Sequence, residues 1–302
     1  MSKYVLLSGS SNRPLALKVA KELKTKLGRI ELEEFPNGEV RVRVLDDVKD
    51  KLVFILESTH KPAERRIIEL ALIADAVKRR GAKKIVAVIP WFGYSPQDKI
   101  FREGEPLSSK VVIRMLEATS ISEFVVVDIH SKDVLRKFSK KVHNLSAMDV
   151  FIDYFKSKLD GSWVSVALDN GAVDRATQFA KALNLPLGRF DKTRDRKTGE
   201  VMFHRLKGDV EGKNIITFDD YVSTGGTTVK SCDFLKKEGA KKCYYCVTHL
   251  IVESTVKKIQ KSRIDLMFFS DSICLDPKLR GKNIKVVSIA PLISEFIEKR
   301  CR

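Results

Sequence analysis

The chain has 302 residues, 43% of them hydrophobic, and a net charge of +17. This suits one large globular domain or two domains of about 150 residues. The charge raises the question of a nucleic-acid partner, but the basic residues are scattered over polar helix faces, as in KVAKELKTKLGR, without interleaved aromatic residues. This pattern indicates a solvated surface and a phosphate-rich substrate rather than nucleic acid. No segment approaches the roughly 18 apolar residues that span a bilayer, so no membrane partner is expected.

The cysteines and the first residues bear on the compartment. Among the five cysteines, only Cys243 and Cys246 form a CxxC motif. Their segment, KKCYYCVTHLI, reads as a strand, in which positions three apart face opposite ways, so neither a metal site nor a disulfide is expected. The opening MSKYVLLSGSSNRP predicts a first strand rather than a signal peptide. These features predict a reduced, cytoplasmic protein.

Strand and helix patterns alternate along the chain. Strands are predicted at 4–8, 52–57, 85–91, 124–129, 163–168, 215–218, 243–251 and 284–289. Helical patterns between them include 64–81, 109–120, 148–159, 174–184 and 227–239. This alternation predicts an α/β chain with central, mostly parallel sheets flanked by helices.

Two segments of the chain look alike. ALIADAVKRRGAKKIVAVIPWFG and TVKSCDFLKKEGAKKCYYCVTHLI each run from a helix through GAKK into a strand, and they lie about half the chain apart. Chance recurrence of GAKK, a common linker, is the alternative to duplicated halves. With duplication, the boundary falls ahead of the helix MDVFIDYF and divides the chain into domains 1–147 and 148–302.

The segment ITFDDYVSTGGTTVKS places two carboxylates directly before a Thr/Gly loop that opens a helix. Glycines and a helix N-terminus favour an anion such as phosphate, which two adjacent acids would repel. A sugar phosphate resolves this conflict, because the loop would hold the phosphate while the acids accept hydrogen bonds from sugar hydroxyls. An ordinary strand-to-helix turn is the alternative. Neither GxxxxGK[ST] nor GxGxxG occurs in the chain, so a P-loop kinase or a dinucleotide enzyme does not fit.

FDDYVSTGGTT resembles the phosphoribosyl-pyrophosphate-binding motif of type I phosphoribosyltransferases and of ribose-phosphate pyrophosphokinases. Further segments are similar to the second family, in its order: FPNGEVRVRV, IPWFGYSPQDK, GEPLSSK, VVVDIHS, DNGAVDRA and FDKTRD. The resemblance implies two duplicated type I phosphoribosyltransferase domains, with ATP on the N-terminal side and ribose 5-phosphate on the C-terminal side. It implies transfer of the β,γ-diphosphoryl group of ATP to the sugar's anomeric hydroxyl.

The resemblance also assigns residues to the sugar side. Residues expected to bind ribose 5-phosphate are Asp219, Asp220, Ser223, Thr224, Gly225, Gly226, Thr227 and Thr228. In the family, a Lys and an Arg matching Lys192 and Arg194 close over the transferring group, which makes these two the expected catalytic residues. Their segment RFDKTRDRKTGEVMF predicts a strand, a turn at KTGE and a returning strand. From the residues alone, a solvated charged hairpin is the favoured alternative.

On the nucleotide side, the resemblance assigns ATP binding to Phe35, Asn37, Glu39, Gln97, Asp98, Lys99, Arg102 and His130. FPNGE reads as a turn between strands, and from the residues alone it indicates nothing further. In the family, this loop reaches the adenine from a neighbouring subunit. The resemblance therefore implies at least a homodimer, with a tetramer or hexamer left open. Asn37 stands in place of the family's usual Asp, and Pro96 in place of a common Arg.

A Mg²⁺ cofactor is implied with His130 and Asp169 as its protein ligands. Both residues follow predicted strands. Mg²⁺ keeps several waters and binds triphosphate oxygens. On chemistry alone His130 reads as a capping histidine, and only the resemblance makes it a ligand. Ser131 and Asn170 stand where many family members have Ala and His.

Two alternatives to a pyrophosphokinase remain at this stage. A catalytically silent relative that regulates active subunits is expected to lose acids or cations, but all of the matching ones are present. A plain phosphoribosyltransferase leaves the N-terminal half and its SPQDK segment unexplained.

Overall fold

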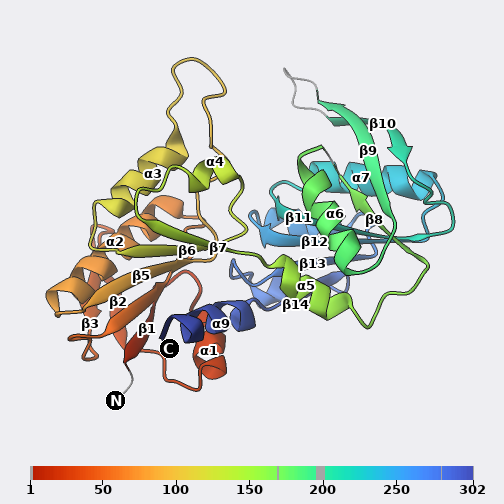
Figure 1. Cartoon of the computed structure of the whole chain (residues 1–302). Helices are drawn as coiled ribbons and strands as arrows, with labels where there is room; N and C mark the ends of the chain where they lie inside the picture. Colours follow the sequence, from red (N-terminus) through yellow and green to blue (C-terminus); the bar gives the residue numbers. More distant parts are fainter. Residues whose placement is uncertain (1–2, 169, 195–200, 280, 302) are drawn as a thin grey trace. The chain divides into compact units, whose positions relative to one another are not determined.

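The structure is a computed structural model that describes residues 3–168, 170–194, 201–279 and 281–301 (Figure 1). The side chains of residues 170, 191–194 and 201–205 also lie outside the description. The chain forms two compact units. Unit 1 comprises Met1–Ser146, Ser272–Cys274 and Ser288–Arg302, and unit 2 comprises Ala147–Asp271 and Leu275–Val287.

Unit 1 is built on a five-stranded, wholly parallel sheet in the order β1-β4-β5-β6-β7. Its strands are β1 (Tyr4–Ser8), β4 (Leu52–Leu56), β5 (Lys84–Ile89), β6 (Glu123–Val127) and β7 (Lys141–Leu145). Runs such as LVFIL and KIVAVI are almost wholly buried, as expected for parallel strands covered on both faces. A separate antiparallel hairpin, β2 (Ile30–Glu34) and β3 (Val40–Val44), leans on helix α2 (Ala63–Arg79).

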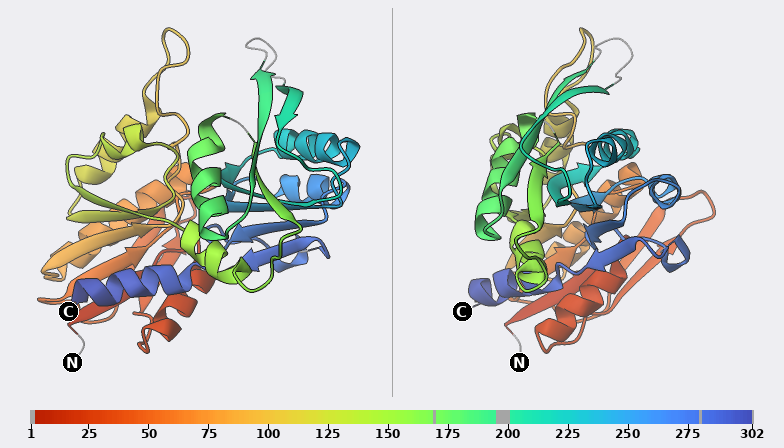
Figure 2. Two further views of the ribbon diagram at one scale, coloured as in Figure 1. Left: turned by 45° about the vertical axis from the view of Figure 1, so that its right-hand side comes forward. Right: turned by 90° about the vertical axis from the view of Figure 1, so that its right-hand side faces the viewer.

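Helices α2 and α3 (Ser108–Glu117) share one hydrophobic core with the sheet. Apolar residues three and four apart in α2, among them Ile67, Leu70, Ala74 and Val77, form the buried stripe that makes this contact. Helix α1 (Arg13–Glu22) packs against α9 (Ala290–Cys301), and the two lie side by side in Figures 1 and 2. A short helix, α4 (Lys132–Leu135), follows β6.

Helix α9 explains where the observed units differ from the predicted domains. Residues 288–302 were assigned to the second domain, whereas they cluster with unit 1. Arg300 Nη2 lies 2.7 Å from Oε1 of the buried Glu123 in β6, and Phe296 packs edge-on against His143 of β7. Burial alone raises the pKa of Glu123, but hydrogen bonds from Arg300 and Lys84 outweigh it and lower the pKa to about 2. An ion pair between residues far apart in the sequence thus holds the C-terminal helix on unit 1.

Unit 2 has a seven-stranded sheet in the order β10-β9-β8-β11-β12-β13-β14, parallel except for the antiparallel β9–β10 pair. The strands are β8 (Trp163–Ala167), β9 (Leu187–Arg194), β10 (Val201–Lys207), β11 (Asn214–Val222), β12 (Lys242–Leu250), β13 (Leu266–Ser270) and β14 (Ile284–Val287). Helices α7 (Gly226–Lys237) and α8 (Ser254–Gln260) share one core with it. Helices α5 (Met148–Phe155) and α6 (Val173–Ala182) contribute Phe151 and Phe179, which pack on Phe218 of β11.

The predicted fold class is confirmed: both units are α/β, with parallel sheets flanked by helices. All eight predicted strands and five predicted helices are present, with shifted ends. Within the described residues, two strands, β7 and β13, were not predicted. β7 is a half-exposed edge strand, KVHNL, without a continuous apolar run, whereas β13, LMFFS, is a short apolar run that could have been found. In the part of the chain that the structure describes, no helix has the length and apolar composition needed to cross a bilayer.

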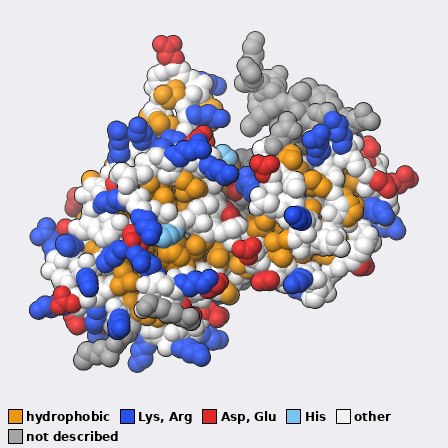
Figure 3. Space-filling view, in the orientation of Figure 1, with side chains coloured by type: hydrophobic (Ala, Val, Ile, Leu, Met, Phe, Trp, Pro, Cys, Tyr) orange, Lys and Arg blue, Asp and Glu red, His pale blue; other side chains and the backbone are white. Residues whose placement is uncertain are grey.

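Lys and Arg side chains are spread over the face of the molecule shown in Figure 3, with Asp and Glu among them. They form no continuous stripe on that face. The high net charge is therefore distributed there as a solvated surface.

Candidate active site

The predicted phosphate loop is a sharp turn between β11 and α7. Gly225 caps α7 with φ of 70°, a left-handed conformation that glycine adopts without strain. A Cβ at this position would lie 2.8 Å from Cγ2 of Thr255 in α8, so the turn also lacks space for a side chain. Helix α7 begins at Gly226, which places its first backbone N–H groups at the turn.

Helix α8 orients this turn. Thr255 Oγ1 donates to the carbonyl oxygen of Ser223, and Lys258 Nζ donates to that of Thr224 at 2.8 Å. In a trans peptide the C=O and N–H point in opposite directions. The N–H groups of Thr224 and Gly225 therefore point away from α8. Together with the helix N-terminus they form a concentration of donors suited to an anion.

The predicted sugar-side residues are brought together at this turn: Ser223, Thr224, Gly225, Gly226, Thr227 and Thr228 span the loop and the first residues of α7. Thr228 is only 6% exposed, so its side chain belongs to the base of the turn rather than to its surface. The other five are partly exposed or supply backbone groups.

The two carboxylates lie inside β11, not after it. The predicted strand ended at Phe218, but parallel pairing continues through Asp219, opposite Val247, to Val222. The strand extends beyond its predicted end because backbone pairing with β12 does not depend on side-chain polarity. The side chain of Asp220 is 6% exposed and that of Asp219 20%, so the charge requires a partner.

Arg175, in the first turn of α6, is a charge partner of both acids. Its Nη1 lies 2.8 Å from Asp220 Oδ1 and 3.5 Å from Asp219 Oδ1. The backbone N–H of Asp220 also donates to Asp219 Oδ1 at 2.9 Å. Arg175 was not predicted as a site residue, although it lies in the segment DNGAVDRA. The available signal was a cation in the first turn of a helix that follows a strand of the site.

Of the expected catalytic pair, the structure describes the backbone but not the side chains. Lys192 and Arg194 belong to β9, which pairs antiparallel with β10 as the hairpin prediction required. Their backbone is placed, opposite Phe203 and Val201 respectively, but their side chains lie outside the described residues. Asp169, the expected metal ligand, lies outside them altogether.

In unit 1, the segment after β5 carries several expected ATP-binding residues. Asp98 is fixed by two hydrogen bonds. Ser131 Oγ donates to Asp98 Oδ2 at 2.7 Å, and Lys137 Nζ donates to the Asp98 carbonyl oxygen at 2.9 Å. Gln97 accepts from Ser108 Oγ at 2.6 Å through its amide oxygen, which directs its NH₂ elsewhere. Asp98 thus anchors the segment, and the amide of Gln97 is oriented as a donor.

Two basic residues follow on the same segment. Arg102 donates its backbone N–H to Glu105 Oε2 at 3.0 Å, as Phe101 does at 3.1 Å, and this closes the loop. The ammonium group of Lys99 lies 5.9 Å from the centre of the Phe101 ring, which is 61% exposed. The loop therefore presents two cations and an aromatic surface to solvent.

The FPNGE segment forms the tip of the β2–β3 hairpin. Phe35 is 43% exposed, with the guanidinium of Arg41 5.9 Å from its ring centre. Asn37 Oδ1 accepts from the backbone N–H of Glu39 at 3.2 Å, and Phe35 N–H donates to the Glu39 carbonyl at 2.8 Å. Asn37 stabilises the turn and leaves the ring of Phe35 projecting.

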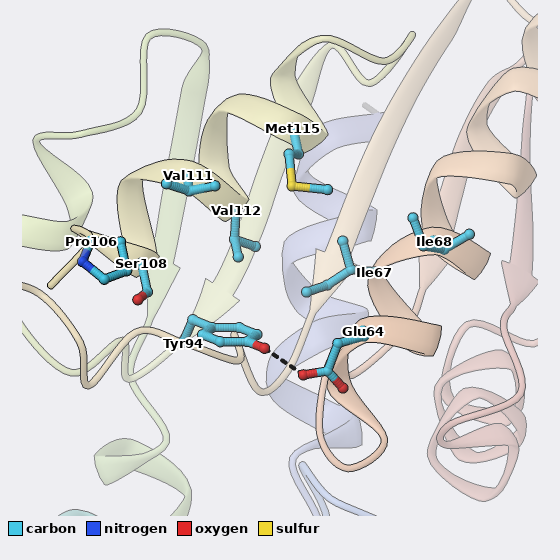
Figure 4. Close-up of a pocket in the computed structure, with 9 residues that line it drawn as sticks. All are labelled: Glu64, Ile67, Ile68, Tyr94, Pro106, Ser108, Val111, Val112 and Met115. Atoms are coloured by element: carbon cyan, nitrogen blue, oxygen red, sulfur yellow. Dashed lines mark hydrogen bonds between the residues drawn. The ribbon is translucent and has the colours of Figure 1, made fainter.

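A nearby depression between α2 and α3 is apolar. The pocket of about 280 Å³ is lined by Ile67 and Ile68 on one side and by Val111, Val112 and Met115 on the other (Figure 4). Tyr94, which also lines it, donates a hydrogen bond to Glu64. It offers no cation for a triphosphate. Ile68 and Met115 are 46% and 49% exposed, which makes this surface suited to apolar contact instead.

His130 is half-buried just beyond β6. Over residues 3–168, 170–194, 201–279 and 281–301, no three His, Cys, Asp or Glu side chains group as a metal site. A closed, all-protein metal cage therefore does not fit the described donors. A Mg²⁺ that takes most of its ligands from water and nucleotide phosphate oxygens needs only one or two protein donors, and His130 is the expected one that the structure describes.

Comparison with known proteins supplies the family. Residues 4–119 match the family model of the N-terminal domain of ribose phosphate pyrophosphokinase, and residues 197–301 match the phosphoribosyl synthetase-associated domain. The ribose-phosphate pyrophosphokinase of Helicobacter hepaticus is 35% identical over 303 residues, covering 100% of this chain and 97% of its own. The chain belongs to the ribose-phosphate pyrophosphokinase family.

Other pyrophosphokinases are similarly related. That of Caldanaerobacter subterraneus is 35% identical over 304 residues, covering 98% of this chain and 96% of its own. The crystal structure of phosphoribosylpyrophosphate synthetase from Mycobacterium smegmatis superposes with a TM-score of 0.90 at 30% identity, covering 98% of each chain. Family likeness thus extends across both units, beyond the FDDYVSTGGTT motif alone.

Proposed function

We infer that this chain is a ribose-phosphate diphosphokinase. It transfers the β,γ-diphosphoryl group of ATP to the 1-hydroxyl of ribose 5-phosphate and yields phosphoribosyl pyrophosphate and AMP. The observation that carries this inference is the β11–α7 turn in a chain that belongs to the pyrophosphokinase family throughout. The turn joins an anion-binding helix N-terminus to two carboxylates, a combination that suits a phosphorylated sugar.

We propose the following division of work on the sugar. The 5-phosphate takes backbone N–H groups from the turn and the first residues of α7, with hydroxyls from Ser223, Thr224 and Thr227. Asp219 and Asp220 accept hydrogen bonds from the ribose hydroxyls, which fixes the direction of the 1-hydroxyl. The bracing of the turn by Thr255 and Lys258 supports this assignment, because it holds the donors in place before the anion arrives.

Lys192 and Arg194 are proposed to stabilise the charge that develops on the transferring group. Diphosphoryl transfer requires little covalent work from a protein, so placed cations can supply most of the acceleration. Support comes from the family and from the β9–β10 pair, which lies at one side of the sheet and carries both residues on β9, next to the edge strand β10.

For the nucleotide, we propose that Gln97 donates to the adenine edge while Lys99, Arg102 and His130 lie along the phosphates, with Asp98 anchoring their loop. Phe35, Asn37 and Glu39 are assigned to the adenine from a second subunit. Mg²⁺, held by His130 and Asp169, would neutralise charge on the triphosphate. We also propose a cytoplasmic location for the chain.

The activity is tested by supplying purified chain with ATP, ribose 5-phosphate and Mg²⁺. AMP and phosphoribosyl pyrophosphate are expected in equal amounts, and neither product is expected when the sugar phosphate is omitted. Binding of both substrates without AMP formation would identify a silent regulatory relative. Consumption of phosphoribosyl pyrophosphate only when a nucleobase is added would identify a phosphoribosyltransferase.

Self-association is proposed as part of this function, to at least a homodimer. Two features support it: Phe35 projects from the hairpin tip, and the α2–α3 surface exposes apolar side chains. Phe35→Ala is expected to raise the KM for ATP strongly. Mixing this variant with Lys192→Ala chains should restore part of the activity, because a hybrid site can combine an intact Phe35 with an intact Lys192. Failure of every mixing ratio to exceed the sum of the separate activities would contradict a shared site.

A further inference from the structure

The sugar-side carboxylates raise an electrostatic problem that the phosphate loop alone does not solve. Asp219 and Asp220 together carry two negative charges beside a site for a phosphate dianion. Each is substantially withdrawn from water, with side chains 20% and 6% exposed. Charges so placed are only weakly screened by solvent and salt. Without a counter-charge they would repel both each other and the substrate.

Arg175 supplies that counter-charge from a neighbouring element. Strands β8 and β11 are adjacent in the sheet, and α6 begins shortly after β8, so its first turn lies beside the end of β11. A single nitrogen, Nη1, contacts both carboxylates, at 2.8 Å for Asp220 and 3.5 Å for Asp219. One guanidinium for two carboxylates leaves a net charge of −1 on the trio. The trio can still accept hydroxyl hydrogens while it repels a phosphate much less than two uncompensated acids would.

The geometry also separates the two acids in kind. Asp220 is nearly buried and makes the shorter contact, as a structural ion pair does. Asp219 makes the longer contact, is more exposed and has its Oδ1 oriented by the N–H of Asp220. A guanidinium that served the fold alone would need only the first of these contacts.

We propose that Arg175 is a positioning residue for ribose 5-phosphate: it holds Asp219 and Asp220 at a fixed spacing and lowers their combined charge so that the sugar phosphate can bind. This rests on the proposed function. Arg175 acts through the carboxylates and does not itself touch the reacting atoms. Lysine should replace it only in part, because its ammonium is a more strongly hydrated point charge on a flexible stem.

The test compares Arg175→Ala and Arg175→Lys with Lys181→Ala, which removes a cation from the exposed end of the same helix. In Arg175→Ala the KM for ribose 5-phosphate should rise about 10- to 100-fold, as for the loss of one charge-assisted bond. The KM for ATP should change little. Arg175→Lys should recover part of the loss, millimolar guanidinium ion should partly rescue Arg175→Ala, and Lys181→Ala should match the wild type.

A double-mutant cycle with Asp220→Asn separates a positioning role from a merely structural one. If Arg175 acts through the carboxylates, Arg175→Ala should cost much less in the Asp220→Asn background. An unchanged ribose 5-phosphate KM in Arg175→Ala, or a loss of kcat and thermal stability alone without guanidinium rescue, would overturn the proposal. A wild-type chain that fails to bind ribose 5-phosphate in calorimetry would instead overturn the proposed function.

Discussion

Replacing both Lys192 and Arg194 by alanine is expected to lower kcat by about 10²- to 10³-fold, by analogy with the loss of a placed oxyanion donor. The reason is that charge spreads over the transferring phosphoryl oxygens mainly in the transition state, so cations aimed at them act there. The KM for each substrate should change little, and kcat/KM should fall together with kcat. Steady-state rates of AMP formation at saturating and limiting ribose 5-phosphate measure both quantities.

Lys207→Ala is the matched control, because it removes a cation from the opposite end of the same hairpin, where Lys207 pairs with Arg189. Its kcat should equal that of the wild type. Near-normal turnover in the double alanine variant would mean that the β9–β10 hairpin is a solvated charged surface. A rise in the KM for ATP with kcat unchanged would make Lys192 and Arg194 binding residues instead of catalytic ones.

At pH values above 8, the Glu57→Gln variant is expected to have a higher thermal unfolding midpoint than the wild type. Glu57 follows β4, is fully buried and accepts from the N–H of Ser11 at 3.2 Å. Glu69 lies in the same cluster, and the Nε of Arg66 is 3.9 Å from Glu57 Oε1, beyond hydrogen-bonding distance. Burial, and next the charge of Glu69, raise the pKa of Glu57 from 4.5 to about 8.

The sign follows from proton linkage. Because the folded-state pKa lies above that of the unfolded chain, the folded state retains a proton that the unfolded state releases between pH 4.5 and about 8. The contribution of Glu57 to the free energy of unfolding is therefore greatest below pH 4.5. It decreases as the pH rises to about 8, by up to about 5 kcal/mol for such a shift. Glutamine keeps the size and hydrogen bonding of the protonated acid without a charge, so most of this pH dependence should disappear.

The measurement is the unfolding midpoint of wild type and variant at several values between pH 5 and pH 9. Glu22→Gln, at an exposed position near the end of α1, controls for loss of one carboxylate. The two midpoints should agree at pH 5 and separate as pH rises. A variant less stable than the wild type at pH 9 would show that Glu57 is ionised there and that its attraction to Arg66 dominates.

The fold class and much of the candidate site could be predicted from local patterns. Buried parallel strands appear in the sequence as apolar runs. The turn at Gly225 needs a residue that tolerates a positive φ, and the glycines of STGG predict such a turn. The β2–β3 hairpin around FPNGE and the antiparallel strands β9 and β10 were likewise visible, because each pair involves neighbours in sequence. The predicted turn at KTGE lies outside the described residues. Asp98 was assigned to ATP binding from its motif alone. The hydrogen bond that Ser131 donates to Asp98 gives Ser131, which departs from the family pattern, a structural role.

The sequence by itself determined the alternation of strands and helices and the glycine-containing turn with its two carboxylates, since each depends on residues a few positions apart. Tertiary structure alone decided which charges meet. Arg175 reaches Asp219 and Asp220 only because β8 and β11 are neighbours in the sheet, and Arg300 reaches Glu123 only because α9 returns to unit 1. Such pairings join residues far apart in the chain, and their energy depends on burial that the sheet order creates. No local periodicity or spacing carries that information.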